Sequence, residues 1–177
     1  QAASQGCGAV CFPELSLTAY TCGDLFQDRT LLAGAESALA SLLEDTAGLD
    51  ILCAVGVPVP WQGALYNCAA VFHKGRLLGL SAKTYIPNYS EFYEARHFTA
   101  APQPMEVTFA GQKTWLGQGL LYCCENVPDL LVGVEICEDL WSPLPPSVSL
   151  ALNGATVILN PSCSDETIGK AEYRREL

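Results

Sequence analysis

The chain has 177 residues, half of them apolar, with 19 acidic and 9 basic side chains and a net charge of −10. This composition excludes wholesale disorder, and the acidic balance argues against nucleic acid or an anionic membrane as a partner, because both need a basic surface. The sequence contains no run of about eighteen apolar residues, which a membrane-spanning helix would need. It also shows no basic segment followed by an apolar one, which would mark the chain for secretion. We expect one domain, with no membrane contact.

Nine cysteines are spread along the chain, and no two of them form a CxxC pair. Most lie in apolar runs, where a free cysteine behaves as a small buried hydrophobe. Two histidines and scattered cysteines do not have the spacing of a zinc site. We therefore predict free thiols in a reducing compartment, which favours a cytoplasmic location, and no metal.

Strands and helices alternate along the chain. The expected strands share apolar or β-prone runs, and they are residues 8–12, 51–59, the two arms of a hairpin within 65–83, 105–109, 119–125, 130–137 and 155–160. The hairpin turns at Lys74-Gly75. One helix is predicted from an Asp24 cap, with Gln27 three residues on, to Gly48, and shorter helices at 145–152 and from 169 onward.

Residues 84–104 have the composition of a loop and are rich in Tyr, Phe, Glu and Pro. The order of the elements predicts a mixed α/β domain with helices packed on a sheet. The aromatic side chains of the loop form either a recognition patch or the packing of a long loop.

Three predicted strands run into a reactive side chain: Glu14, Lys83 and Cys137. In α/β folds sites collect at the carboxyl ends of strands, so these three groups could converge. A carboxylate can take the proton of a thiol, and a lysine with the backbone N–H of Glu138 can stabilise the oxyanion formed when a thiolate attacks an amide. This chemistry requires no metal or organic cofactor.

Each of the three residues also has an ordinary structural interpretation. Glu14 could cap a loop, Lys83 could be a solvated strand end, and Cys137 could be one more buried thiol. A Cys–His dyad that uses His97 is another possibility, although a lone histidine, here His73 or His97, is more often structural. Phosphate-binding motifs of the GxxxxGK[ST] or GxGxxG type are absent from the sequence.

The segments FPELSLTAYTCGDLF, AKTYIPNYSEFYEARHF and GVEICEDLW, which contain the three residues, resemble the nitrilase (carbon–nitrogen hydrolase) superfamily. In detail they are similar to one branch, the glutamine-hydrolysing domain of glutamine-dependent NAD synthetases, as is NPSCSDETIGKAEYRREL near the C-terminus. The resemblance covers nearly the whole chain. It implies an α-β-β-α sandwich, usually assembled as a homo-oligomer.

The resemblance implies a catalytic triad of Glu14 as base and then acid, Lys83 at the tetrahedral intermediate, and Cys137 as the nucleophile that forms a glutamyl thioester. Four further residues are implied as substrate contacts: Tyr89, Phe92, Glu138 and Ser164. Glu94, in an E-x-x-x-F pattern with Phe98, would orient Lys83 or the substrate amide, unless it is an ordinary loop carboxylate.

The chain also departs from the family pattern. Only thirteen residues precede Glu14, and the later strands of the sandwich are missing after Leu177. We therefore expect residues 1–177 to be a carbon–nitrogen hydrolase domain truncated at both ends, which folds poorly alone. The ATP- and Mg-dependent synthetase domain, which would use the ammonia from glutamine to amidate deamido-NAD, is expected to be a partner elsewhere in a longer chain. The alternatives are an amidase for another small amide and a non-catalytic fragment that only associates.

Overall fold

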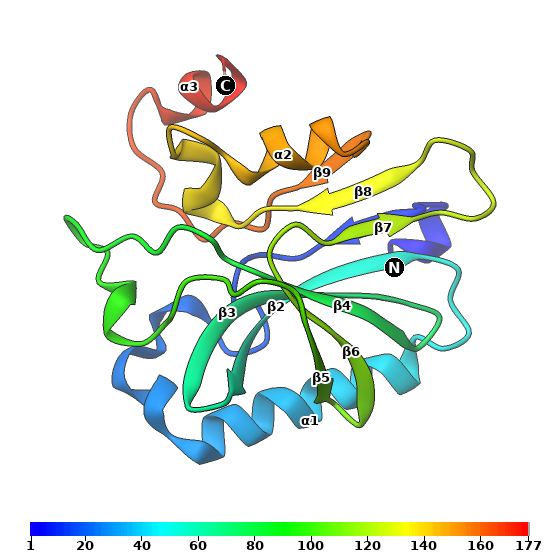
Figure 1. The fold of residues 1–177 in the computed structure, drawn as a ribbon, viewed down its shortest axis with the longest axis horizontal. Coiled ribbons are helices and arrows are strands. Elements are labelled where there is room, and N and C mark those ends of the chain that lie inside the picture. Colours follow the sequence, from blue (N-terminus) through cyan, green and yellow to red (C-terminus); the bar gives the residue numbers. More distant parts are fainter. Residues whose placement is uncertain (177) are drawn as a thin grey trace.

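The structure, a computed structural model, describes residues 1–176 and contains two sheets that lie face to face (Figure 1). Helix α1 (Arg29–Asp45) lies on the outer face of the larger sheet, and α2 (Pro146–Leu152) lies outside the smaller one. The layer order is therefore α-β-β-α. This confirms the predicted fold class.

The larger sheet contains six strands in the order β1-β2-β3-β4-β6-β5. Their bounds are β1 (Ala9–Cys11), β2 (Leu52–Trp61), β3 (Ala64–His73), β4 (Arg76–Ala82), β5 (Met105–Phe109) and β6 (Gln112–Gly117). The pairs β1–β2 and β4–β6 are parallel, and the others are antiparallel. His73 faces Arg76 across the predicted turn, so the hairpin is confirmed.

Strand β6 was not predicted from the sequence. Its exposed residue Trp115 and its buried residue Thr114 invert the usual alternation, in which the apolar side chain faces the core. The pairing partners on both sides, β4 and β5, place this segment in the sheet.

The smaller sheet contains β7 (Leu121–Cys123), β8 (Leu131–Val134) and β9 (Val157–Leu159), and β8 and β9 are parallel. The chain then continues to α3 (Lys170–Glu176). Four short 3-10 helices complete the elements: η1 (Ala3–Gln5), η2 (Tyr20–Gln27), η3 (Glu94–Arg96) and η4 (Cys137–Trp141). Apart from η3, the stretch 84–104 contains neither helix nor strand, as predicted.

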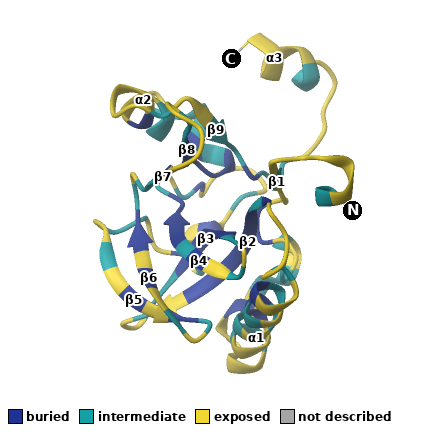
Figure 2. Cartoon of the chain, turned by 90° about the vertical axis from the view of Figure 1, so that its right-hand side faces the viewer, coloured by how far each residue is buried: buried dark blue, intermediate teal, exposed yellow. Residues whose placement is uncertain are grey.

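Strand β2 is buried over most of its length (Figure 2), and alternate side chains along it belong to two separate layers of the core. Val55, Val57 and Val59 pack with α1 residues, including Leu39, on the outer face of the larger sheet. Ala54 points the other way and packs with residues of the smaller sheet. A small side chain on this inner face lets the two sheets approach each other, and this brings their strand ends together.

The predicted cap of the long helix is wrong by one turn. Asp28, not Asp24, caps α1, and its Oδ1 accepts a hydrogen bond from Thr30 N at 2.7 Å. Residues 20–27 form the 3-10 helix η2 with a kink at Gly23, so the α-helix cannot begin there. The Asp24 carboxylate instead accepts a hydrogen bond from Arg96 Nε at 2.7 Å.

Candidate active site

Three strand ends deliver the three predicted reactive residues to the space between the sheets. Glu14 lies in the turn after β1, Lys83 directly follows β4, and Cys137 begins η4 just after β8. Lys83 Nζ donates a hydrogen bond to Glu14 Oε1 at 2.7 Å, so these two residues are in direct contact. The site is built at the carboxyl ends of strands from both sheets, as expected for this fold class.

A glycine on β2 makes room for the Glu14 turn. A Cβ atom at Gly56 would lie 2.0 Å from Leu15 N and 2.7 Å from the carbonyl carbon of Glu14. The turn is also tied to Gly56 by hydrogen bonds, because Leu17 N donates to its carbonyl and Ser16 Oγ accepts from its N–H, both at 3.0 Å. The position of Glu14 therefore depends on a backbone contact that any side chain at Gly56 would prevent.

Lys83 lies between two carboxylates in a fully enclosed position. Its exposed fraction is 0%, against 2% for Glu14 and 6% for Glu94. Nζ donates to Glu94 Oε1 at 2.7 Å and to Oε2 at 3.0 Å, in addition to Glu14. Burial opposes the charge on Lys83, but the two carboxylates outweigh it and raise the pKa of Lys83. Lys83 therefore keeps its positive charge and its position, which suits it to stabilise an oxyanion better than to donate a proton.

Further polar groups complete the hydrogen bonds of the two carboxylates. Asn67 Nδ2 donates to Glu14 Oε1 at 2.7 Å, and the backbone N–H of Cys163 donates to Glu14 Oε2 at 3.1 Å. The Tyr20 hydroxyl donates to Glu94 Oε1 at 2.7 Å. Burial raises the pKa of Glu94 against the opposing effect of Lys83. The network holds each carboxylate in one orientation.

Cys137 occupies a strained backbone position beside this network. Its φ of 47° lies in the left-handed region, which is uncommon for a residue with a side chain, and its N–H donates to Pro161 O at 3.2 Å. Burial and the negative charge of Glu14 raise the pKa of Cys137 to about 12, while Lys83 opposes this shift. The resting form is thus a thiol, and a base must remove its proton before it can act as a nucleophile.

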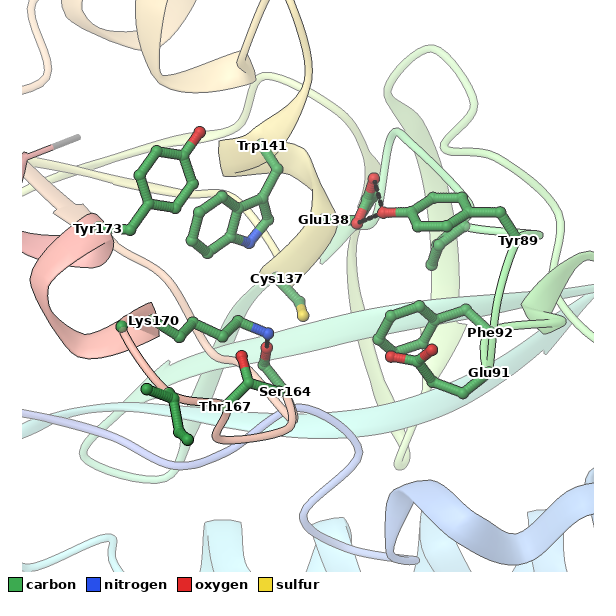
Figure 3. A pocket seen from close by; sticks show the side chains of 13 residues that line it. Tyr89, Glu91, Phe92, Cys137, Glu138, Trp141, Ser164, Thr167, Lys170 and Tyr173 are labelled. Carbon is green, nitrogen blue, oxygen red and sulfur yellow. Dashed lines mark hydrogen bonds between the residues drawn. The ribbon is translucent and has the colours of Figure 1, made fainter.

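A cavity of about 480 Å³ opens over Cys137 (Figure 3). One wall carries Tyr89, whose hydroxyl donates to Glu138 Oε1 at 2.8 Å. The facing wall comes from the segment after β9, where Lys170 Nζ donates to Ser164 Oγ at 2.6 Å. The Cys137 sulfur lies between these walls in Figure 3. The cavity therefore presents a carboxylate on one side of the thiol and an ammonium on the other.

Four of the predicted substrate contacts line this cavity: Tyr89, Phe92, Glu138 and Ser164. Glu94 contacts Lys83 and Tyr20 instead of the cavity, so its contacts favour the role of orienting Lys83. Neither histidine lines the cavity: His97 packs on Phe26 and Phe98, and His73 Nε2 lies 2.9 Å from Asp50 Oδ1. These contacts place both histidines away from a Cys–His dyad.

Sequence reasoning missed three polar residues of the site. Asn67 was detectable as the single amide in an otherwise apolar strand. Lys170 stood in the NPSCSDETIGKAEYRREL segment without a separate role. Its place in the cavity depends on the stacking of Tyr173 on Trp141, with ring centroids 5.2 Å apart, which brings α3 against η4. Asp139 stood in the GVEICEDLW segment without a separate role.

Within residues 1–176 no group of three or more His, Cys, Asp or Glu side chains is arranged to hold a metal ion. The same residues include no helix with both the length and the apolar content needed to cross a membrane.

The comparisons with known proteins agree with the sequence resemblance. The carbon–nitrogen hydrolase family model matches residues 1–176. The chain is 41% identical over 175 residues to a glutamine-dependent NAD(+) synthetase of Mycobacterium tuberculosis, and this covers 97% of the chain and 26% of the relative. A second relative of the same description, from Aquifex aeolicus, is 33% identical over 165 residues, which is 93% of the chain and 26% of the relative.

Solved structures give the same result. The glutamine-dependent NAD(+) synthetase of Cytophaga hutchinsonii superposes with a TM-score of 0.81 at 34% identity, over 99% of this chain and 28% of that one. An amidase of the nitrilase superfamily from Nesterenkonia superposes with a TM-score of 0.68 at 18% identity, over 96% of this chain and 57% of that one, and this shows the fold alone. The chain thus spans about a quarter of the length of the synthetases that it matches.

Proposed function

The chain belongs to the carbon–nitrogen hydrolase family, and we propose that it hydrolyses the side-chain amide of glutamine through a thioester on Cys137. One observation carries the proposal. A buried thiol lies close enough to the Glu14–Lys83 pair to feel both charges, in a cavity with a carboxylate and an ammonium on its facing walls. The buried pair supplies acid–base and electrostatic groups, and the two walls match the charges of a free amino acid.

In the first half of the proposed reaction Glu14 removes the proton of the Cys137 thiol as the sulfur attacks the amide carbon. A C–S bond forms, and the carbonyl oxygen becomes an oxyanion that Lys83 Nζ and the N–H of Glu138 stabilise. Glu14 then returns the proton to the amide nitrogen, the C–N bond breaks, and ammonia leaves. The product is a glutamyl thioester on Cys137.

In the second half water attacks the thioester carbon, and Glu14 now takes a proton from that water. The second tetrahedral intermediate uses the same Lys83 cation. Its collapse breaks the C–S bond, and the proton on Glu14 returns to sulfur, which restores the thiol and releases glutamate. The hydrogen bonds from Asn67 and Cys163 to Glu14 support its use as base and then acid, because they keep the carboxylate in one orientation through both halves of the reaction.

Glutamine fits the proposed cavity by its charges. Its α-ammonium would pair with Glu138, which Tyr89 already holds, and its α-carboxylate would pair with Lys170 and Ser164. Phe92 would contact the methylene groups between the two ends. An amide without the charged α-carbon would leave both walls unpaired, so the site should discriminate strongly against it.

The relatives' descriptions extend the proposal to a longer chain. We propose that the ammonia serves a synthetase domain of the same longer chain, which uses ATP and Mg to amidate deamido-NAD. The glutamine hydrolysis itself would use no cofactor. Assembly as a homo-oligomer and a cytoplasmic location, where nine free thiols would persist, are part of the same proposal.

The test is covalent labelling with a glutamine-like diazo ketone, read by intact mass together with ammonia release from glutamine. The unmodified full-length protein should gain one adduct and hydrolyse glutamine. Cys137→Ala should lose the adduct and lower hydrolysis by at least about 10⁴-fold, while Cys124→Ala, at the residue after β7, should retain both. Glutamine hydrolysis that survives in Cys137→Ala would refute the proposal. Hydrolysis of other small amides in preference to glutamine would identify a different amidase.

A further inference from the structure

We propose that Asp139 is a positioning residue that sets the Lys83 ammonium against the Cys137 thiol by holding the backbone next to each of them. The inference rests on the proposed function and adds a residue that touches neither the substrate nor the reacting atoms. Asp139 would fix the relative positions of two groups that come from different sheets.

The Asp139 side chain is almost completely enclosed, with 1% of it exposed. Its Oδ1 accepts hydrogen bonds from Thr84 N at 3.0 Å and Tyr85 N at 2.8 Å. Its Oδ2 accepts one from Ile136 N at 2.9 Å and lies 3.3 Å from Thr84 N. One carboxylate thus binds the N–H groups of three residues from two separate segments.

The two segments are the ones that carry the proposed chemistry. Thr84 and Tyr85 directly follow Lys83 at the end of β4, in the larger sheet. Ile136 directly precedes Cys137 at the end of β8, in the smaller sheet. A shift of Asp139 would therefore move the ammonium and the thiol relative to each other, and misplacement of reacting groups by about 1 Å can lower a rate by about 100-fold.

The ionised form of Asp139 suits this task. All the partners named above are donors, and an ionised carboxylate offers only acceptors. Burial raises the pKa of Asp139 to about 6, although the three N–H groups and the nearby charge of Lys83 favour the anion. The group is therefore ionised at neutral pH. An asparagine of the same shape would turn an NH₂ group toward one of the N–H donors.

A neighbouring residue provides a matched control. Glu135 is also buried, at 2% exposed, and its Oε2 accepts a hydrogen bond from Ser147 N at 2.9 Å. This contact joins the end of β8 to the start of α2 and involves no residue next to Lys83. Glu135 is thus a buried carboxylate close to Cys137 in sequence, whose side-chain hydrogen bond leads to α2 and not to the segment after Lys83.

The experiment compares Asp139→Asn, Asp139→Glu and Glu135→Gln in the full-length protein. We expect Asp139→Asn to lower kcat for glutamine about 10- to 100-fold with KM changed less than about threefold, because binding groups stay in place while reacting groups shift. Asp139→Glu, which keeps the charge but adds a methylene, should lie between Asp139→Asn and the unmodified protein. Glu135→Gln should lower the unfolding midpoint and leave kcat unchanged.

A second measurement separates this inference from the proposed function. The rate of Cys137 alkylation by iodoacetamide, followed by mass, should fall in Asp139→Asn and stay unchanged in Glu135→Gln, whatever the natural substrate is. A protein that does not hydrolyse glutamine but shows this difference would refute the substrate and support the positioning role. If Asp139→Asn does not fold, Asp139→Glu decides. A folded Asp139 variant with unchanged kcat and unchanged alkylation would overturn the inference.

Discussion

The candidate site has two halves whose charges are held in different ways. Behind the thiol, Glu14, Lys83 and Glu94 are at most 6% exposed, and Lys83 Nζ lies 2.7 Å from an oxygen of each carboxylate. In front of it, Tyr89 is 54% exposed and the Lys170 side chain 20%. Buried charges must be paired, because an unpaired one costs several kcal/mol, whereas exposed charges keep much of their hydration. We call these the buried half and the open half.

This difference predicts which residues depend on each other for stability and activity. In the buried half each group is held by its neighbours, so a single change should damage both stability and chemistry. In the open half the pairs Tyr89–Glu138 and Ser164–Lys170 stand on separate walls, so a change in one should alter substrate affinity and little else. The three predictions below test this contrast.

The strongest test of the buried half is Lys83→Met. Removal of the ammonium leaves two enclosed carboxylates facing each other, so we expect a loss of about 3–5 kcal/mol in the free energy of unfolding and loss of glutamine hydrolysis. Urea unfolding and ammonia release measure the two effects. The control is Lys74→Met, whose ammonium is half exposed and lies 3.1 Å from Asp50, and which should leave both nearly unchanged. A Lys83→Met protein as stable as the unmodified one would contradict the contrast.

Gly56→Ala tests the same half without removing a charge. The added Cβ would meet Leu15 N and displace the turn that carries Glu14, which we expect to cost about 1–3 kcal/mol of stability and to lower kcat. The matched control is Gly34→Ala on α1, where a Cβ would meet nothing within 4 Å and should stabilise the helix by about 0.5–1 kcal/mol. If both alanine variants behaved alike, the close approach at Gly56 would not be what positions Glu14.

The reactive residues of the buried half could be predicted from strand ends, whereas the open half could be predicted only in part. The resemblance gave the cavity residues Tyr89, Phe92, Glu138 and Ser164 but not Lys170. Glu14, Lys83 and Cys137 each end a recognisable strand, and strand ends meet at one edge of a sheet whatever the loops do. Lys170 lies in the cavity only because α3 packs on Trp141, a long-range contact without a local pattern. Two errors had local causes: Asp24 and Asp28 are equally good caps by type, and the exposed Trp115 concealed β6. Local sequence patterns predict candidate helices, strands and caps, and tertiary contacts decide which of them form.

The open half is tested most directly by Lys170→Met. Loss of the ammonium should raise KM for glutamine about tenfold, equivalent to about 1.4 kcal/mol. It should leave kcat and stability near those of the unmodified protein, because Lys170 is partly exposed and its polar contacts are with Ser164 and Asp165, not with Glu14 or Lys83. Steady-state kinetics with glutamine and with 4-aminobutanamide, which lacks the α-carboxylate, give the measurement. The variant should lose its preference for glutamine over that analogue, while Lys113→Met, an exposed lysine on β6, should keep it. A fall in kcat together with stability would mean that Lys170 belongs to the buried half after all, and that the two halves are not independent.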